Sequence, residues 1–243
     1  MISVASDQPK TGQRKPWVQV LAILLGVGPV YIPTIISHLQ RSQPLSAKDI
    51  FFYITIFGSI MIIVMLLILK YLCGERIRDL NLKKGRWWKD ILLGLGLTVL
   101  TLGSLNLLRN PINSVFPREP DSGLGDFFNE MVTNPILFGL IMGPVLIIGA
   151  GVFEELTRVF LLSRLWKLSP SRVWRWSAII LSAVLFGLAH LYQGHAGVVS
   201  TGISGLILAI AYHYTGRVIP LMLSHYLHDA VQFAAIYIMA NAT

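Results

Sequence analysis

The sequence predicts an all-α fold, a polytopic integral membrane protein with about seven to eight transmembrane helices. Of its 243 residues, 54% are hydrophobic and 13% are charged, whereas soluble domains carry about 25% charged residues. Several apolar runs reach the length of about 20 residues that a helix needs to cross a bilayer. Lys and Arg gather in polar segments between these runs, as in proteins oriented in a membrane. An ordinary soluble domain is therefore excluded.

Seven apolar runs can be separated in the chain. They cover residues 17–39, 50–72, 91–108, 135–165, 173–191, 196–214 and 218–240. The first should bend at Pro29 and Pro33, because proline interrupts helical hydrogen bonding. The fourth is too long for one straight crossing and contains the interruptions Gly143-Pro144 and Gly149-Ala150-Gly151, so we expect a tilted, kinked or broken helix.

The polar segments complete this organisation. Residues 1–16 lack the apolar core of a cleaved signal peptide and are expected to be a polar cytoplasmic segment. The long polar stretch 109–133 is interpreted as a surface loop rather than a lid, with a short interfacial helix over 126–131. We divide the rest into amino-terminal membrane helices with this loop (17–133) and a carboxy-terminal core (134–243).

Basic residues indicate the orientation. In the alternate loops that face away from the amino terminus, the basic residues are Arg41, Lys48, Arg109 and Arg118. The other loops are richer in Lys and Arg, which places the amino terminus in the cytoplasm and, with seven crossings, the carboxy terminus outside. The net charge of +8 is then explained by basic loops that orient the protein in the membrane, and no nucleic-acid partner is expected. The single cysteine, Cys73, excludes an internal disulfide and a multi-cysteine metal site.

Two adjacent carboxylates, Glu154 and Glu155, interrupt the fourth apolar run. Ionisable residues inside a membrane helix are costly and are interpreted as functional by default. Arg158 follows Glu154 by four positions, which predicts that the two face one another on a helix. One carboxylate would then be neutralised, leaving the other as a candidate general base. The alternative is an ion pair that only joins two helices.

Histidines and a third carboxylate lie in later runs. His190 ends the fifth run, four residues after Phe186, which could shield it, and the seventh contains His225 and, four residues later, Asp229. A Glu can take a proton from water, while His side chains can donate to the oxyanion that forms on a peptide carbonyl. Zinc or another divalent metal could use Glu154, His190 and His225, but no His-Glu-x-x-His helix is present, so a reaction without cofactor is favoured.

Three segments resemble the motifs of the CAAX protease and bacteriocin-processing family of intramembrane proteases, over roughly residues 143–233. The segments are Glu154-Glu155-Leu-Thr-Arg158, Phe186-Gly-Leu-Ala-His190 and His225-Tyr-Leu-His-Asp229. The resemblance implies an all-helical membrane hydrolase. In it, Glu154 would activate water with help from His190, while His225 and Asp229 would stabilise the oxyanion.

One departure from the family pattern concerns the arginine. The family has three residues between the second glutamate and the arginine, whereas Leu156 and Thr157 alone intervene here, and Val159 occupies the family's arginine position. A shift of one residue turns the side chain by about 100° around a helix. We therefore expect Arg158 to face Glu154, and the identity of the base stays open between the two glutamates.

The predicted function is that of an intramembrane endopeptidase acting on a prenylated or other membrane-associated peptide or protein, with the bilayer as its surroundings. The alternative is a catalytically inactive relative that serves as a scaffold, immunity or regulatory membrane protein. A proton-relay transporter is disfavoured, because the inverted repeats common in transporters are not found in the sequence.

Overall fold

The computed structural model describes residues 15–39, 51–80, 86–117 and 124–242. Most of the predicted amino-terminal segment lies outside these residues. Several of the basic residues that indicate the orientation also lie outside the described residues. They are Arg41, Lys48 and Arg118 of the poorer loops and Lys10, Arg14, Lys83 and Lys84 of the richer ones.

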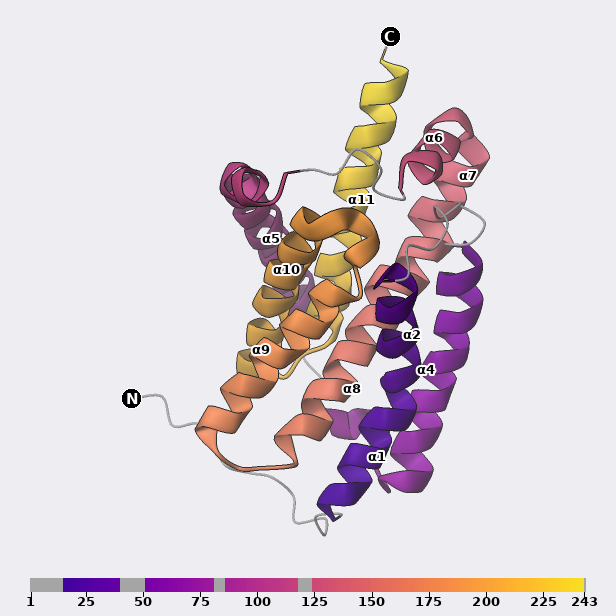
Figure 1. The fold of residues 1–243 in the computed structure, drawn as a ribbon. Helices are drawn as coiled ribbons and strands as arrows, with labels where there is room; N and C mark the ends of the chain where they lie inside the picture. Colours follow the sequence, from indigo (N-terminus) through magenta and orange to yellow (C-terminus); the bar gives the residue numbers. More distant parts are fainter. Residues whose placement is uncertain (1–14, 40–50, 81–85, 118–123, 243) are drawn as a thin grey trace.

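The described elements are all helical (Figure 1). The α-helices are α1 (Pro16–Gly26), α2 (Gly28–Leu39), α4 (Gly58–Leu67), α5 (Trp87–Val115), α6 (Gly125–Thr133), α7 (Pro135–Leu140), α8 (Glu155–Trp166), α9 (Arg172–Leu188), α10 (Gly194–Thr215) and α11 (Ile219–Asn241). Wider π-helical turns form η1 (Phe52–Phe57), η2 (Ile68–Leu72), η4 (Ile141–Val145) and η5 (Ile147–Glu154), and tighter 3₁₀ turns form η3 (Ile77–Leu80) and η6 (Leu191–Gln193).

The all-α, multi-pass membrane prediction is confirmed. Four helices of the described residues are long and apolar enough to cross a membrane, namely Phe52–Leu72, Trp87–Val115, Pro135–Trp166 and Leu191–Thr215. The pair Pro16–Gly26 and Gly28–Ile36, bent by 51°, makes a possible fifth. This count is below the predicted seven to eight, because α9 has 17 residues and α11 carries polar groups among its 23.

The expected irregularities occur where glycine and proline stand. The bend between α1 and α2 lies beside Pro29, at the start of α2, whereas Pro33, where a second bend was predicted, lies inside α2. In the fourth span, the two π-helical segments η4 and η5 contain Pro144 and the Gly149–Gly151 stretch, so the helix continues with altered turns. Such π-helical turns often occur at functional sites. The third span was predicted to end at residue 108, but α5 continues to Val115 and takes up the start of the polar stretch.

Helix α8 forms the centre of the molecule. Figure 1 shows it between α9 and α10 on one side and α1 and α4 on the other, and it also contacts α11. All its residues from Glu155 to Leu165 are buried. In contrast, outward positions of the surrounding helices expose large apolar side chains such as Val99, Leu107 and Ile136, as expected for surfaces that face lipid.

Candidate active site

The two glutamates lie where η5 passes into α8, and they point in different directions. The Glu155 side chain is fully buried, whereas the Glu154 side chain is 22% exposed and lines a cavity. Consecutive helical residues are separated by about 100°, so neighbouring carboxylates can enter separate surroundings. One glutamate therefore faces the protein interior and the other faces the cavity.

Arg158 pairs with Glu155, not with Glu154 as predicted. Its Nη1 atom lies 2.8 Å from Glu155 Oε1 and 3.0 Å from Glu155 Oε2. Positions i and i+3 share a helix face as well as positions i and i+4, and here the buried carboxylate takes the cation. The guanidinium also lies over the Phe186 ring, with Cζ 3.9 Å from its centroid, which is a cation–π contact.

His190 follows the last turn of α9 and faces the cavity. Its Nδ1 lies 2.8 Å from the carbonyl oxygen of Phe186. A carbonyl can only accept, so Nδ1 carries a proton and donates to it. The other ring nitrogen, Nε2, lies 3.6 Å from Glu154 Oε2. The backbone of α9 thus holds the imidazole with Nε2 toward the carboxylate.

His225 of α11 connects the two glutamates. Its Nδ1 lies 2.8 Å from Glu155 Oε1, and its Nε2 lies 3.8 Å from Glu154 Oε2 and 3.8 Å from Asp229 Oδ2. The Phe186 ring packs edge-on against this imidazole, 5.7 Å between centroids. Side chains that are 70 positions apart in sequence therefore meet through a direct hydrogen bond.

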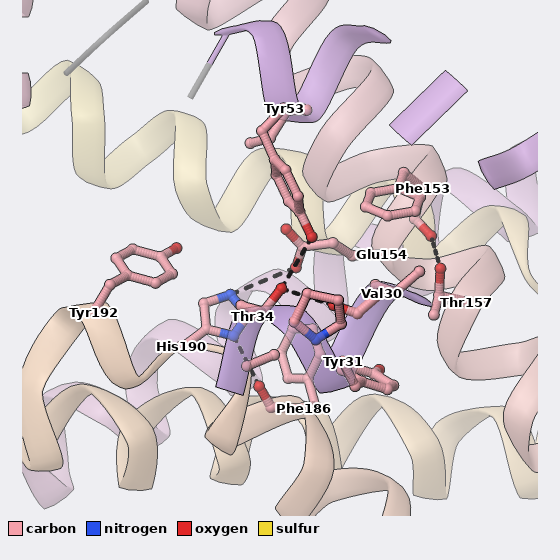
Figure 2. Close-up of a pocket in the computed structure, with 13 residues that line it drawn as sticks. Val30, Tyr31, Thr34, Tyr53, Phe153, Glu154, Thr157, Phe186, His190 and Tyr192 are labelled. Atoms are coloured by element: carbon pink, nitrogen blue, oxygen red, sulfur yellow. Dashed lines mark hydrogen bonds and ion pairs between the residues drawn. The ribbon is translucent and has the colours of Figure 1, made fainter. Parts of the chain in front are cut away.

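The site opens into a cavity of about 300 Å³ (Figure 2). Helices η5, α8, α9 and η6 form one wall, which includes Glu154, Phe186, His190 and Tyr192. The opposite wall was not predicted from sequence. It comes from α2 and η1 and consists of Val30, Tyr31, Pro33, Thr34, Tyr53 and Ile54. In the sequence, these wall residues could have been recognised only by the hydroxyl groups of Tyr31, Thr34 and Tyr53 within apolar runs, and such hydroxyls are too common to identify a site.

All seven residues singled out from the sequence as catalytic or supporting lie in this one cluster. They are Glu154, Glu155, Arg158, Phe186, His190, His225 and Asp229. His228 lies elsewhere, with its Nδ1 3.0 Å from Thr101 Oγ1 of α5. In the described part of the chain, no group of three or more His, Cys, Asp or Glu side chains is arranged to hold a metal ion.

The distances around Glu154 suit a bound water or substrate oxygen. Glu154 Oε2 is buried and has no hydrogen-bond partner within the described residues. The separations of 3.6 Å and 3.8 Å to the two imidazoles exceed a direct hydrogen bond, and polar groups at such distances are commonly bridged by water. The arrangement can therefore hold a small oxygen species between a carboxylate and two imidazoles.

The comparison with known families agrees with this arrangement. Residues 135–231 match the model of the family described as type II CAAX prenyl endopeptidase Rce1-like, and this stretch contains all seven clustered residues. No curated protein and no solved structure matches the chain. Residues 135–231 are therefore similar to the CAAX protease family.

Proposed function

We propose that this protein is an intramembrane endopeptidase that hydrolyses a peptide bond in a prenylated or other membrane-associated substrate. One observation carries the proposal. The Glu154 carboxylate lines a cavity within the helical core and has two imidazoles within 4 Å, at 3.6 Å and 3.8 Å. The family match to prenyl endopeptidases supports the substrate class.

In this proposal Glu154 is the base. Glu155 is engaged by Arg158 and His225, whereas Glu154 faces the cavity. A water placed between Glu154 and His190 would donate one hydrogen to the carboxylate and the other to His190 Nε2, which directs an oxygen lone pair at the substrate carbonyl. Glu154 takes the proton as the carbon–oxygen bond forms. It returns the proton to the amide nitrogen as the carbon–nitrogen bond breaks.

His225 is proposed to stabilise the oxyanion. Both of its nitrogens face carboxylate oxygens, at 2.8 Å from Glu155 and at 3.8 Å from Glu154 and Asp229. This favours an imidazolium with two N–H donors, one held by Glu155 and the other available to the developing negative charge. Glu155 and Arg158 would act as positioning residues, and Asp229 would support the charge of His225. No step of the proposed reaction passes through a metal.

We also propose that α9 and α11 cross the membrane, which gives seven crossings with a cytoplasmic amino terminus. Their outward faces support this because they expose apolar side chains, including Ile180 and Val184 on α9 and Ile238 and Met239 on α11. The helices of residues 17–133 would then build one cavity wall, and residues 134–243 would carry the catalytic groups.

The test uses protein reconstituted in liposomes and an S-farnesylated cysteine-aliphatic-aliphatic-serine peptide. Glu154→Gln should lower kcat at least about 100-fold, the smaller end of general-base effects. Glu155→Gln should lower stability, because Arg158 loses its buried partner, but the folded fraction should retain measurable cleavage, because the base remains. Each is assayed with and without chelator; loss of wild-type activity on chelation would contradict the metal-free reaction.

Two results would overturn the proposed function. Full activity of Glu154→Gln would remove Glu154 from the reaction. Wild-type protein that leaves this peptide and unprenylated membrane peptides uncleaved would favour the inactive scaffold, immunity or regulatory role instead.

A further inference from the structure

The cavity wall opposite His190 comes from helices outside the family-matched segment. Its side chains are mostly apolar, but Thr34 of α2 and Tyr53 of η1 bring two hydroxyls together, 3.0 Å apart. Stacking on Phe57, with ring centroids 4.9 Å apart, fixes the direction of the Tyr53 ring. Figure 2 shows the Tyr53 hydroxyl pointing from this wall toward Glu154.

The direction of the hydrogen bond between these hydroxyls follows from counting protons. Thr34 Oγ1 lies 2.7 Å from the carbonyl oxygen of Val30, which can only accept. A threonine hydroxyl has one hydrogen, and the shorter contact, 2.7 Å to Val30 against 3.0 Å to Tyr53, favours its use on Val30, so that Thr34 accepts from Tyr53. The Tyr53 oxygen has then donated its own hydrogen and presents lone pairs to the cavity. It is an acceptor for an incoming N–H group.

A peptide in this cavity needs such an acceptor. Burying an amide N–H without a partner is costly, and much of the surrounding surface consists of apolar groups such as Val30, Ile54 and Phe153. In apolar surroundings a hydrogen bond is also electrostatically stronger than in water. Because Glu154 and Tyr53 lie on opposite walls, a peptide held by Tyr53 would present its carbonyl carbon to the water beside Glu154.

We propose that Tyr53 is a substrate-binding residue whose phenolic oxygen accepts a hydrogen bond from a backbone N–H flanking the scissile bond. Thr34 is the positioning residue that fixes the Tyr53 proton. This inference rests on the proposed function and extends it to the way in which the peptide is aligned. It also assigns part of substrate recognition to helices that precede the family-matched segment.

The test measures binding separately from cleavage. Glu154→Gln protein in lipid nanodiscs is titrated with the farnesylated peptide and with two analogues, in each of which one amide flanking the scissile bond is replaced by an ester. An ester has no N–H, so one analogue should bind about threefold to tenfold more weakly than the amide peptide. Adding Tyr53→Phe should abolish this preference, and adding Thr34→Val should reduce it. A purely structural role of either residue would weaken amide and ester peptides alike.

Tyr71→Phe is the matched control, because this tyrosine is 69% exposed and does not line the cavity; it should retain the full preference. An unchanged preference in Tyr53→Phe would overturn the inference. If wild-type protein does not cleave the peptide but Tyr53 still sets the preference, the proposed function fails and the inference stands. If wild-type protein cleaves the peptide and the Tyr53→Phe variant still prefers the amide to the ester peptide, the proposed function stands and the inference fails. Absence of binding in every variant contradicts both proposals.

Discussion

Arg158 is a buried cation whose charge is met by a single carboxylate. Its side chain is 1% exposed, and its Nε and Nη2 atoms have no hydrogen-bond partner within the described residues. Removing one partner of a buried ion pair leaves the other charge uncompensated, which costs about 3–5 kcal/mol, whereas replacing both partners by neutral groups is often tolerated. We therefore expect the fold to depend on the Glu155 carboxylate as the partner of Arg158.

Glu155→Gln should accordingly lower the thermal unfolding temperature in detergent micelles strongly, because Arg158 then lacks its carboxylate, whereas Arg158→Met should lower it less, because Glu155 keeps His225 at 2.8 Å. The double variant Arg158→Met with Glu155→Gln should recover part of the loss seen in Glu155→Gln. Arg78→Met is the control, since Arg78 makes an exposed pair with Asp79 at 4.0 Å, and such pairs contribute about 0–1 kcal/mol. Equal stability of Glu155→Gln and Arg78→Met would contradict this account.

For single residues, the sequence indicates which side chains gather around Glu154 better than it indicates which of them contact one another. Glu154, Glu155 and Arg158 were recognisable because ionisable groups are rare in apolar runs. Their pairing was predicted wrongly, since positions three and four residues apart both face one another on a helix. The choice between the two glutamates involves His225, whose approach from α11 depends on the tertiary fold.

Among the elements, α9 and α10 are held together at a place where only glycine fits. A Cβ atom on Gly187 would lie 2.5 Å from the carbonyl oxygen of Val198 and 3.2 Å from Cα of Gly202. Both are backbone atoms that cannot rotate away. Small residues of this kind allow membrane helices to approach closely. The carbonyl of Gly187 also accepts from the His190 N–H at 2.9 Å, so the contact positions the His190 imidazole.

Gly187→Ala should therefore separate α9 from α10, lower stability by about 1–3 kcal/mol, as overpacking does, and reduce kcat by displacing His190. Gly103→Ala on α5 is the control, because a Cβ there meets no atom within 4 Å. Unfolding temperature and cleavage of the farnesylated peptide are measured for both. If Gly187→Ala kept the unfolding temperature and the cleavage rate of wild type, α9 and α10 could accommodate a Cβ atom, and this account would be contradicted.

A second contact between elements ties α8 to α1 and to the segment after η2. Arg164 is fully buried and donates to Gln19 at 3.2 Å and to Glu75 at 2.9 Å and 2.5 Å. Lys167 Nζ also lies 2.6 Å from Glu75. Burial raises the pKa of Glu75, but hydrogen bonds and charge from Arg164 and Lys167 outweigh it, so the pKa lies below its ordinary value of 4.5.

A depressed carboxyl pKa gives stability that is fully present above the unfolded value, near 4.5, and is lost as the pH falls through the folded value. Glu75→Gln should thus unfold at a lower temperature than wild type at pH 7, and the difference should shrink when the pH is taken below about 4.5. Asp126→Asn, which changes an exposed carboxylate at the start of α6, should show a small difference throughout. A Glu75→Gln deficit that stays constant with pH would contradict the ionic explanation.

For the whole molecule, hydropathy and the three motifs singled out the polar residues of the carboxy-terminal part but not the complete cavity lining. The motif residues stand out chemically in their apolar runs. Tyr31, Thr34 and Tyr53 do not, because tyrosine and threonine are ordinary constituents of membrane helices. Their role depends on α2 and η1 packing beside η5 and η6, and contacts of such long sequence separation follow from tertiary structure rather than from local pattern.

The number of crossings decides on which side each loop lies, and α9 and α11 are the helices that hydropathy leaves open. Figure 1 shows the carboxy terminus and the α8–α9 turn at opposite ends of the molecule, as expected if the last three long helices all cross. Single cysteines can test this in a Cys73→Ser background, at exposed positions on either side of these helices. The sites are Ser171 before α9, His195 at the start of α10 and Ala242 after α11.

With seven crossings, a membrane-impermeant maleimide added to intact cells should label His195→Cys and Ala242→Cys, and should label Ser171→Cys only after permeabilisation. If α9 does not cross, His195→Cys will behave like Ser171→Cys. If α11 alone does not cross, Ala242→Cys will be protected while His195→Cys reacts. Since each arrangement gives its own pattern, the three positions together determine whether α9 and α11 span the bilayer and whether the basic loop before α9 faces the cytoplasm, as the positive-inside rule requires.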